Sequence, residues 1–203
     1  KDGRPWPKVL ETLIRKEIPS PRPVEVINAG VAGYNLRDSL IRLAQDVLPL
    51  RPDMIISYHG YNGFHFLDDT LEDTERTALQ AIPPKFIDRP LKLLAQAEYQ
   101  VKLGIFRRKH FSSTPPAAAL ERRRTVVLDS YSADLYRQLI AVTKTNGIEL
   151  VLLSHNLAVN EKSPPEVVRF YRSGFPDVRH RIQANQLHTH LLETLAGQNP
   201  EVS

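Results

Sequence analysis

Several residue types and patterns are missing from this chain, and each absence excludes a class of structure. The sequence has no cysteine, which excludes disulfide bonds and thiolate chemistry. It has no run of about 18 apolar residues, the length that spans a membrane, and no signal-peptide pattern at its start. We therefore expect no membrane segment in these residues. The compartment stays open, because a signal or anchor ahead of Lys1 would place the protein outside the cytoplasm.

Charge of one sign is only in modest excess, with a formal net charge of +4. Much of the positive charge lies in two basic clusters, residues 107–109 and 122–124. A surface that binds nucleic acid interleaves basic residues with aromatic ones, and only Phe106 and Phe111 lie near these clusters. We interpret the clusters as solvated segments and expect no nucleic-acid partner.

The chain does have the composition of an ordinary globular domain. Its 203 residues are 41% hydrophobic and 25% charged, which is enough for one domain with a buried core. We predict a single α/β domain over residues 1–203. Within it, regular alternation lapses at residues 64–119, where only a helix at residues 90–104 is predicted. This insertion or lid-like excursion either covers a pocket or elaborates the surface.

The stretch that organises the chain is a strand–helix–strand pattern. Two short apolar runs, residues 24–27 and 53–58, predict buried strands. Between them, residues 36–48 repeat apolar side chains at helical spacing, and Asn35 is placed to cap that helix. Strands joined in this way run parallel, so the loops that follow them lie at one edge of the sheet, where such sheets bind ligands.

The other predicted elements continue this alternation. They are a helix at residues 8–18, a long helix at residues 120–145 with Gly147 as its C-cap, a third strand at residues 148–154, a loop at residues 156–165 and a helix at residues 176–196. The loop at 156–165 is expected on the same edge of the sheet as the two earlier loops.

Two of these loops carry a resemblance to a known family. Residues 28–34 read Asn-Ala-Gly-Val-Ala-Gly-Tyr, and residues 60–62 read Gly-Tyr-Asn. In this order they resemble the second and third conserved blocks of the SGNH hydrolases, also called the GDSL esterase/lipase family. The resemblance implies a three-layer αβα sandwich with a mostly parallel, flavodoxin-like sheet. It also implies that the Gly33 backbone N–H and the Asn62 side-chain amide form an oxyanion hole.

Other blocks of that family are absent from this sequence. It contains neither the Gly-Asp-Ser block with the nucleophile nor the Asp-x-x-His block with the base, and Gly63 stands where the family usually has Asp. In the family's fold, the nucleophile strand lies between the strands that correspond to residues 24–27 and 53–58. We therefore expect a domain without its first and last strands, which keeps the oxyanion half of the site and is inactive in isolation.

The resemblance implies an ester hydrolase that needs no cofactor and acts on a small-molecule ester, such as an acylated carbohydrate or lipid. Glycine suits an oxyanion hole because no Cβ shields its N–H, and asparagine donates without titrating. The alternative function is a catalytically inactive binding domain for a sugar or acyl ligand. A dinucleotide site fits less well, because Asn28 stands where its fingerprint needs glycine and Asp53 opens the next strand instead of ending it.

Other candidate residues carry weaker signals. Ser154 and His155 are adjacent, so their side chains point to opposite faces of an extended chain. The serines at positions 39 and 57 are expected to be structural, and His59 and His65 flank the Asn62 loop, where they line a pocket or have no role. No metal site is predicted, because His188 and His190 lie on different sides of their helix.

Overall fold

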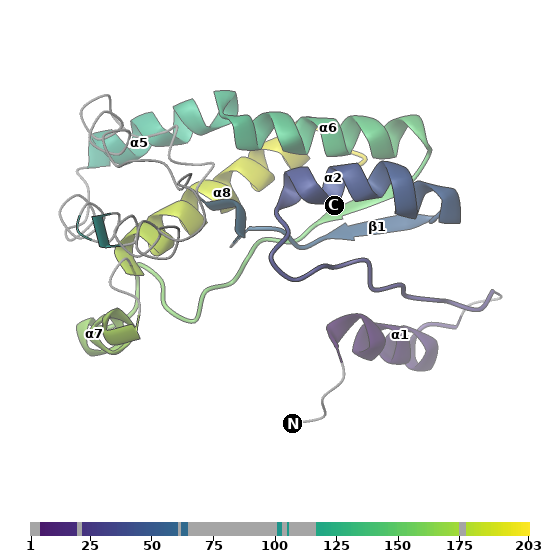
Figure 1. The fold of residues 1–203 in the computed structure, drawn as a ribbon, viewed down its shortest axis with the longest axis horizontal. Helices are drawn as coiled ribbons and strands as arrows, with labels where there is room; N and C mark the ends of the chain where they lie inside the picture. Colours follow the sequence, from purple (N-terminus) through teal and green to yellow (C-terminus); the bar gives the residue numbers. More distant parts are fainter. Residues whose placement is uncertain are drawn as a thin grey trace, which may run out of the picture.

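The computed structural model describes residues 5–19, 22–60, 62–64, 101–102, 105, 117–174 and 178–203. Within them it is a mixed α/β structure that is mostly helical (Figure 1). The predicted helix at residues 90–104 and most of the predicted excursion at residues 64–119 lie outside the described residues. None of the described helices combines the length and the apolar character that crossing a membrane requires.

The sheet has two parallel strands. These are β1 (Met54–Ser57) and β2 (Glu149–Leu152), paired from Met54 opposite Glu149 to Ser57 opposite Leu152. The strands predicted at residues 53–58 and 148–154 are thus confirmed, each shortened at its ends. On its other side, β2 bonds to the last residue of the chain, since Ser203 N–H donates to the Leu150 carbonyl at 3.0 Å. β2 therefore has a neighbour on both sides.

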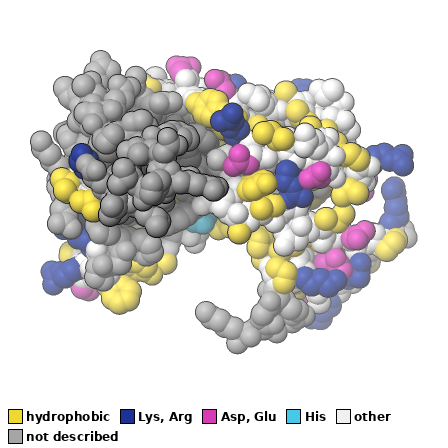
Figure 2. All heavy atoms as spheres, viewed as in Figure 1, with side chains coloured by type: hydrophobic (Ala, Val, Ile, Leu, Met, Phe, Trp, Pro, Cys, Tyr) yellow, Lys and Arg dark blue, Asp and Glu magenta, His cyan; other side chains and the backbone are white. Residues whose placement is uncertain are grey.

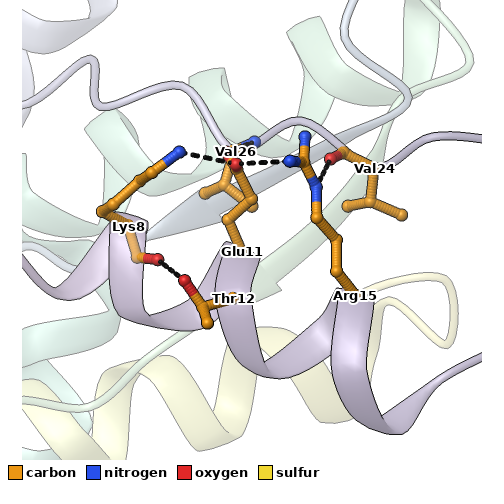
Figure 3. A network of polar contacts seen from close by, with 6 residues as sticks. All are labelled: Lys8, Glu11, Thr12, Arg15, Val24 and Val26. Atoms are coloured by element: carbon orange, nitrogen blue, oxygen red, sulfur yellow. Dashed lines mark hydrogen bonds and ion pairs between the residues drawn. The ribbon is translucent and has the colours of Figure 1, made fainter.

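The strand predicted at residues 24–27 is wrong. This segment is extended, but no strand pairs with it in the part of the chain that the structure describes. The helix predicted at residues 8–18 is confirmed as α1 (Trp6–Glu17). Side chains of α1 bond to the backbone of this extended segment (Figure 3). Val26 N–H donates to the Glu11 carboxylate at 3.0 Å, and the Val24 carbonyl accepts from Arg15 Nε at 2.7 Å. An extended segment becomes a strand only when a neighbour pairs with its backbone.

The two-stranded sheet of the described residues is therefore smaller than the flavodoxin-like sheet that the resemblance implies. Two paired strands and the helices beside them make an α/β structure in the coarse sense. Figure 1 shows α2 (Leu36–Arg42), α6 (Tyr131–Thr145) and α8 (Val178–Gln198) gathered near the strands, with α1 apart from them. The helix predicted at residues 176–196 is confirmed in α8. The preceding α7 (Pro165–Gly174) was not predicted.

The helix predicted at residues 36–48 has the predicted extent but not a single geometry. α2 begins with a capping box, in which Asn35 Oδ1 accepts from the Asp38 N–H and Asp38 Oδ2 accepts from the Asn35 N–H, both at 3.2 Å. The chain then widens into the π-helical turn η1 (Leu43–Val47) and tightens into the 3-10 turn η2 (Leu48–Leu50). Pro49 lies in that turn and has no N–H to continue an α-helix.

The helix predicted at residues 120–145 is not continuous, because the α-helix is interrupted at residues 127–130. The structure has α5 (Ala117–Val126), the 3-10 turn η4 (Val127–Asp129) and then α6. Ser130 is extended between them, and its hydroxyl accepts from the Ala133 N–H at 3.3 Å, which is an N-cap. Gly147 ends α6 with a φ of +66°, as predicted for a C-cap.

The main core lies between α6, α8 and β2. Its least accessible side chains come from these elements and from η4, namely Leu150, Leu191, Leu195, Val127 and Thr143. In a smaller cluster, Val167, Val168 and Tyr171 of α7 pack against Val159 and against Val178 and Ile182 of α8. The core fixes where β2 ends, and with it the edge of the sheet at which the loops meet.

Candidate functional site

The parallel strands bring two loops to one edge of the sheet. Ser57 ends β1 beside Leu152, the last residue of β2, and the next residue, Leu153, donates its N–H to the Ser57 carbonyl at 2.9 Å. The loop after β1, residues 58–64, and the loop after β2 therefore start side by side. This is the edge where open parallel sheets bind ligands, as the sequence predicted.

Gly33 lies in the turn that precedes α2. Its φ is +84°, and a Cβ built on it would meet nothing within 4 Å, so the conformation and not the space requires glycine. The turn is closed by Tyr34 N–H, which donates to the Val31 carbonyl at 3.2 Å. Within the described residues, the Gly33 N–H forms no hydrogen bond, and Gly33 is exposed. Its N–H is thus a donor available to a ligand.

The Asn62 side chain connects the loop after β1 to the loop before α2, which contains Gly33. Its Nδ2 donates to the Tyr34 carbonyl at 3.0 Å, which places the Asn62 side chain against the residue that follows Gly33. An amide nitrogen carries two N–H groups, so this bond leaves one for a ligand. The structure therefore brings together the loop that contains Gly33 and the loop that contains Asn62, the two loops that carry the resemblance to SGNH hydrolases.

His59 connects the end of β1, which precedes the Asn62 loop, to α2, which follows the Gly33 turn. Its Nδ1 lies 2.8 Å from Ser57 Oγ at the end of β1, and its Nε2 lies 2.9 Å from Ser39 Oγ on α2. Burial lowers the pKa of His59, so the ring is neutral at neutral pH, with one nitrogen donating and the other accepting. Each hydroxyl can take the complementary role.

Aromatic and imidazole rings pack closely around Gly60, near the start of the loop after β1. A Cβ on Gly60 would lie 3.0 Å from His155 Cβ and 3.4 Å from His188 Cε1. The Tyr58 ring lies 5.3 Å from the His155 ring, and the Phe64 ring lies 5.9 Å from the His188 ring. Gly60 therefore permits a close approach, and a Cβ at this position would require its neighbours to shift by a few tenths of an ångström.

His188 is the most buried member of this group. Its Nε2 lies 2.7 Å from the Tyr136 hydroxyl, while its Nδ1 is buried without a partner among the described residues. Burial, and then the nearby His155 and His59, lower the pKa of His188 to about 4. Burial also raises the pKa of the Tyr136 hydroxyl, so both groups are neutral at pH 7.

The roles of His59 and His188 were missed from the sequence. From the sequence, His59 lines a pocket beside Asn62 or has no role, and His188 is considered only as a potential metal ligand. Ser39, one partner of His59, lies 20 positions away, and Tyr136, the partner of His188, lies 52 positions away, so spacing carried no signal for these pairs. In the part of the chain that the structure describes, no three His, Asp or Glu side chains are grouped to hold a metal ion.

The arrangement suits recognition of a polar group with an apolar attachment. The Gly33 N–H and the free N–H of Asn62 can donate to an oxygen that carries negative charge. Exposed apolar side chains belong to the same two loops, with Val31, Tyr34 and Tyr58 each about two-fifths exposed.

Comparison with protein-family models, curated proteins and solved structures finds no match for this chain. The chemistry of the two loops, together with the resemblance that they carry, is what bears on function.

Proposed function

We propose that these residues belong to an ester hydrolase of the SGNH type, in which Gly33 and Asn62 form the oxyanion hole. The observation that carries the proposal is the hydrogen bond from Asn62 Nδ2 to the Tyr34 carbonyl, which joins the two loops. Both donors then belong to one site. Donors fixed before the reaction stabilise the negative charge that develops on the carbonyl oxygen when an ester is attacked.

The nucleophile and the base would come from residues outside the printed sequence, since it contains neither family block. One edge of β1 has no hydrogen-bonded neighbour among the described residues, which supports a missing strand that carries the nucleophile. Because the Ser57 carbonyl faces β2, the backbone groups of Met54 and Ile56 face the opposite edge, where the described residues provide no partner. Residues 24–27 likewise have no strand neighbour in the part of the chain that the structure describes. The resemblance expects the nucleophile strand between these two segments, within a three-layer sandwich.

The proposed substrate is an ester of an acylated carbohydrate or lipid. Tyr34 and Tyr58 offer exposed ring faces that can contact an acyl chain or the apolar face of a sugar. Burial lowers the pKa values of His59 and His155, so the imidazoles near the site stay uncharged and do not compete for the oxyanion. The reaction needs no cofactor, because attack and oxyanion stabilisation use protein groups alone.

The test is hydrolysis of p-nitrophenyl acetate by the protein expressed from its complete reading frame. Asn62→Asp keeps the size of the side chain and removes its donors, so it should lower kcat about 10²-fold to 10³-fold. Gly33→Ala should lower kcat because the left-handed turn that presents its N–H is strained by a Cβ.

Two controls match these changes. Gly147→Ala carries the same strain at a φ of +66° at the far end of α6, and Asn146→Asp removes an amide that also donates to a carbonyl, that of Val142. Neither should lower kcat. Absence of turnover in the wild-type protein, or unchanged kcat in both site variants, would refute the proposal.

The second candidate function is a catalytically inactive binding domain for a sugar or acyl ligand. It is favoured by Gly63, which replaces the usual Asp and closes a tight turn through its N–H to the Gly60 carbonyl at 2.7 Å. Saturable binding of an acetylated sugar without hydrolysis, weakened by Asn62→Asp, would support it. A Gly-Asp-Ser block and an Asp-x-x-His block in the flanking reading frame would count against it.

A further inference from the structure

We propose that His59 is the positioning residue of this site, because its two ring nitrogens bind the element behind Gly33 to the element behind Asn62. This inference rests on the proposed function. Ser39, the partner of Nε2 at 2.9 Å, lies on α2, and Ser57, the partner of Nδ1 at 2.8 Å, ends β1. One imidazole ring thus sets how far the two oxyanion donors lie from each other.

The path from His59 to each donor is short. Asn35 caps α2 and follows Gly33 by two residues, so a force that holds Ser39 also holds the turn at Gly33. On the other side, Asn62 follows His59 by three residues, and the turn between them is closed by the Gly63 N–H bond to Gly60. Donors that are held in place before the reaction need no reorganisation when charge develops.

The other connection between the loops cannot do this alone. The bond from Asn62 to the Tyr34 carbonyl uses an exposed side chain, and that side chain is itself one of the two donors. His59 is partly buried, and both of its nitrogens are engaged. Exposed hydrogen bonds exchange with water, whereas buried ones in a satisfied network hold their geometry.

A serine bonded to a neutral histidine is also the arrangement of a nucleophile and its base. The experiment must therefore separate positioning by His59 from catalysis by Ser39. It has two parts, one that needs no enzymatic activity and one that does.

The first part uses nuclear magnetic resonance on the 203-residue chain. In His59→Ala, the contact between the Asn62 side-chain amide and Tyr34 should be lost, and the Gly63 amide should exchange at least about tenfold faster. Core amides such as that of Leu150 should keep their protection. The matched control His190→Ala, on α8, should leave the loops unchanged.

Two results of this part would overturn the inference. One is an intact contact between Asn62 and Tyr34 in folded His59→Ala protein. The other is an equal loss of protection in loops and core, which indicates general stabilisation by His59. Ser39→Ala removes one of the two bonds and should loosen the Asn62 contact less than His59→Ala does.

The second part measures hydrolysis of p-nitrophenyl acetate by the complete protein. His59→Ala should lower kcat about tenfold or more while KM stays within about twofold, because the oxyanion exists only in the transition state. His59→Gln offers one donor and one acceptor and should restore part of kcat. Hydrolysis by the isolated 203 residues that Ser39→Ala abolishes would make Ser39 the nucleophile and overturn positioning. Absence of wild-type turnover would refute the proposed function, and the resonance measurement would still decide the role of His59.

Discussion

The N-terminal arm, α1 with residues 22–31, and the core formed by α6, β2 and α8 contrast in how they use apolar side chains. In the core, Leu150 and Leu191 are almost inaccessible, at 1% and 0% exposure. In the arm, Leu13 and Ile27 are 50% and 56% exposed. Both regions carry amphipathic patterns, so the difference comes from the neighbours that each finds in the fold.

Polar contacts hold the arm together in place of a core. The Glu11 carboxylate accepts from Lys8 Nζ at 2.7 Å, from the Val26 N–H at 3.0 Å and forms an ion pair with Arg15 at 3.2 Å (Figure 3). In the view of Figure 2, hydrophobic and charged side chains lie next to one another on the described part of the surface. An amphipathic helix forms from its own pattern, whereas burial of its apolar face needs a second surface.

The largest difference between the regions is expected on deletion of a leucine. Leu191→Ala removes a side chain with no solvent exposure and should lower the free energy of unfolding by about 2–5 kcal/mol. The matched change Leu13→Ala should lower it by less than about 0.5 kcal/mol, because half of that side chain already contacts water. Urea unfolding of both variants checks this. Equal losses would mean that Leu13 is buried in solution.

Acid should weaken the core through His188. Its pKa is lowered to about 4 by burial and then by His155 and His59, from an ordinary value of 6.5. Between these values the unfolded chain binds a proton that the folded chain excludes, so stability is full above pH 6.5 and falls as the pH drops toward 4. The loss attributed to this group is about 3 kcal/mol.

Urea unfolding between pH 7.5 and 4.5 measures that loss. His188→Gln should flatten the pH dependence over this range, because the titrating group is gone. His190→Gln, on the same helix, should leave it in place. A wild-type stability that does not fall between pH 6.5 and 4.5 would contradict burial of a neutral His188.

Two glycines test close packing against free space. Gly60→Ala places a Cβ 3.0 Å from His155 Cβ and should lower the free energy of unfolding by about 1–3 kcal/mol. Gly197→Ala, in α8, meets nothing within 4 Å and should raise it by about 0.5–1 kcal/mol. Thermal unfolding compares them. Equal effects of the same sign would show that His155 yields to the added methyl group.

The smallest global effect is expected from Glu11. The hydrogen bond from Lys8, followed by that from Val26, lowers the pKa of this carboxyl group. Glu11→Gln should speed hydrogen exchange of the Val26 amide and leave the Leu150 amide unchanged, since the arm and the core share no large contact. Glu17→Gln, whose partner Lys16 is exposed, is the control and should change neither amide.

Local signals predicted much of the fold. The Asn35 cap, the Gly147 end of α6 and the two paired strands follow from residues within a few positions. The break at Ser130 was missed because apolar spacing continues across it, although serine is a common N-cap. The segment at residues 24–27 has the pattern of a strand and lacks the neighbour that would make it one.

The candidate site was predictable only in part. The positions of Gly33 and Asn62 stand out because each follows a strand pattern and lies in a segment that resembles a block of the SGNH hydrolases. The connection of Asn62 to Tyr34 spans 28 positions, and those of His59 and His188 span 20 and 52. Spacing cannot report pairs that are formed by folding.

The sequence by itself determined where α1, α2, α6 and α8 lie, that Asn35 and Gly147 cap helix ends, and that the Asn62 loop follows a strand. These depend on backbone preferences and on contacts within a few residues. Only the tertiary structure decided that residues 24–27 pair with no strand among the described residues, that His188 is neutral beside Tyr136, and that His59 joins α2 to β1. These depend on burial and on partners far apart in the chain, which the packed fold alone brings together.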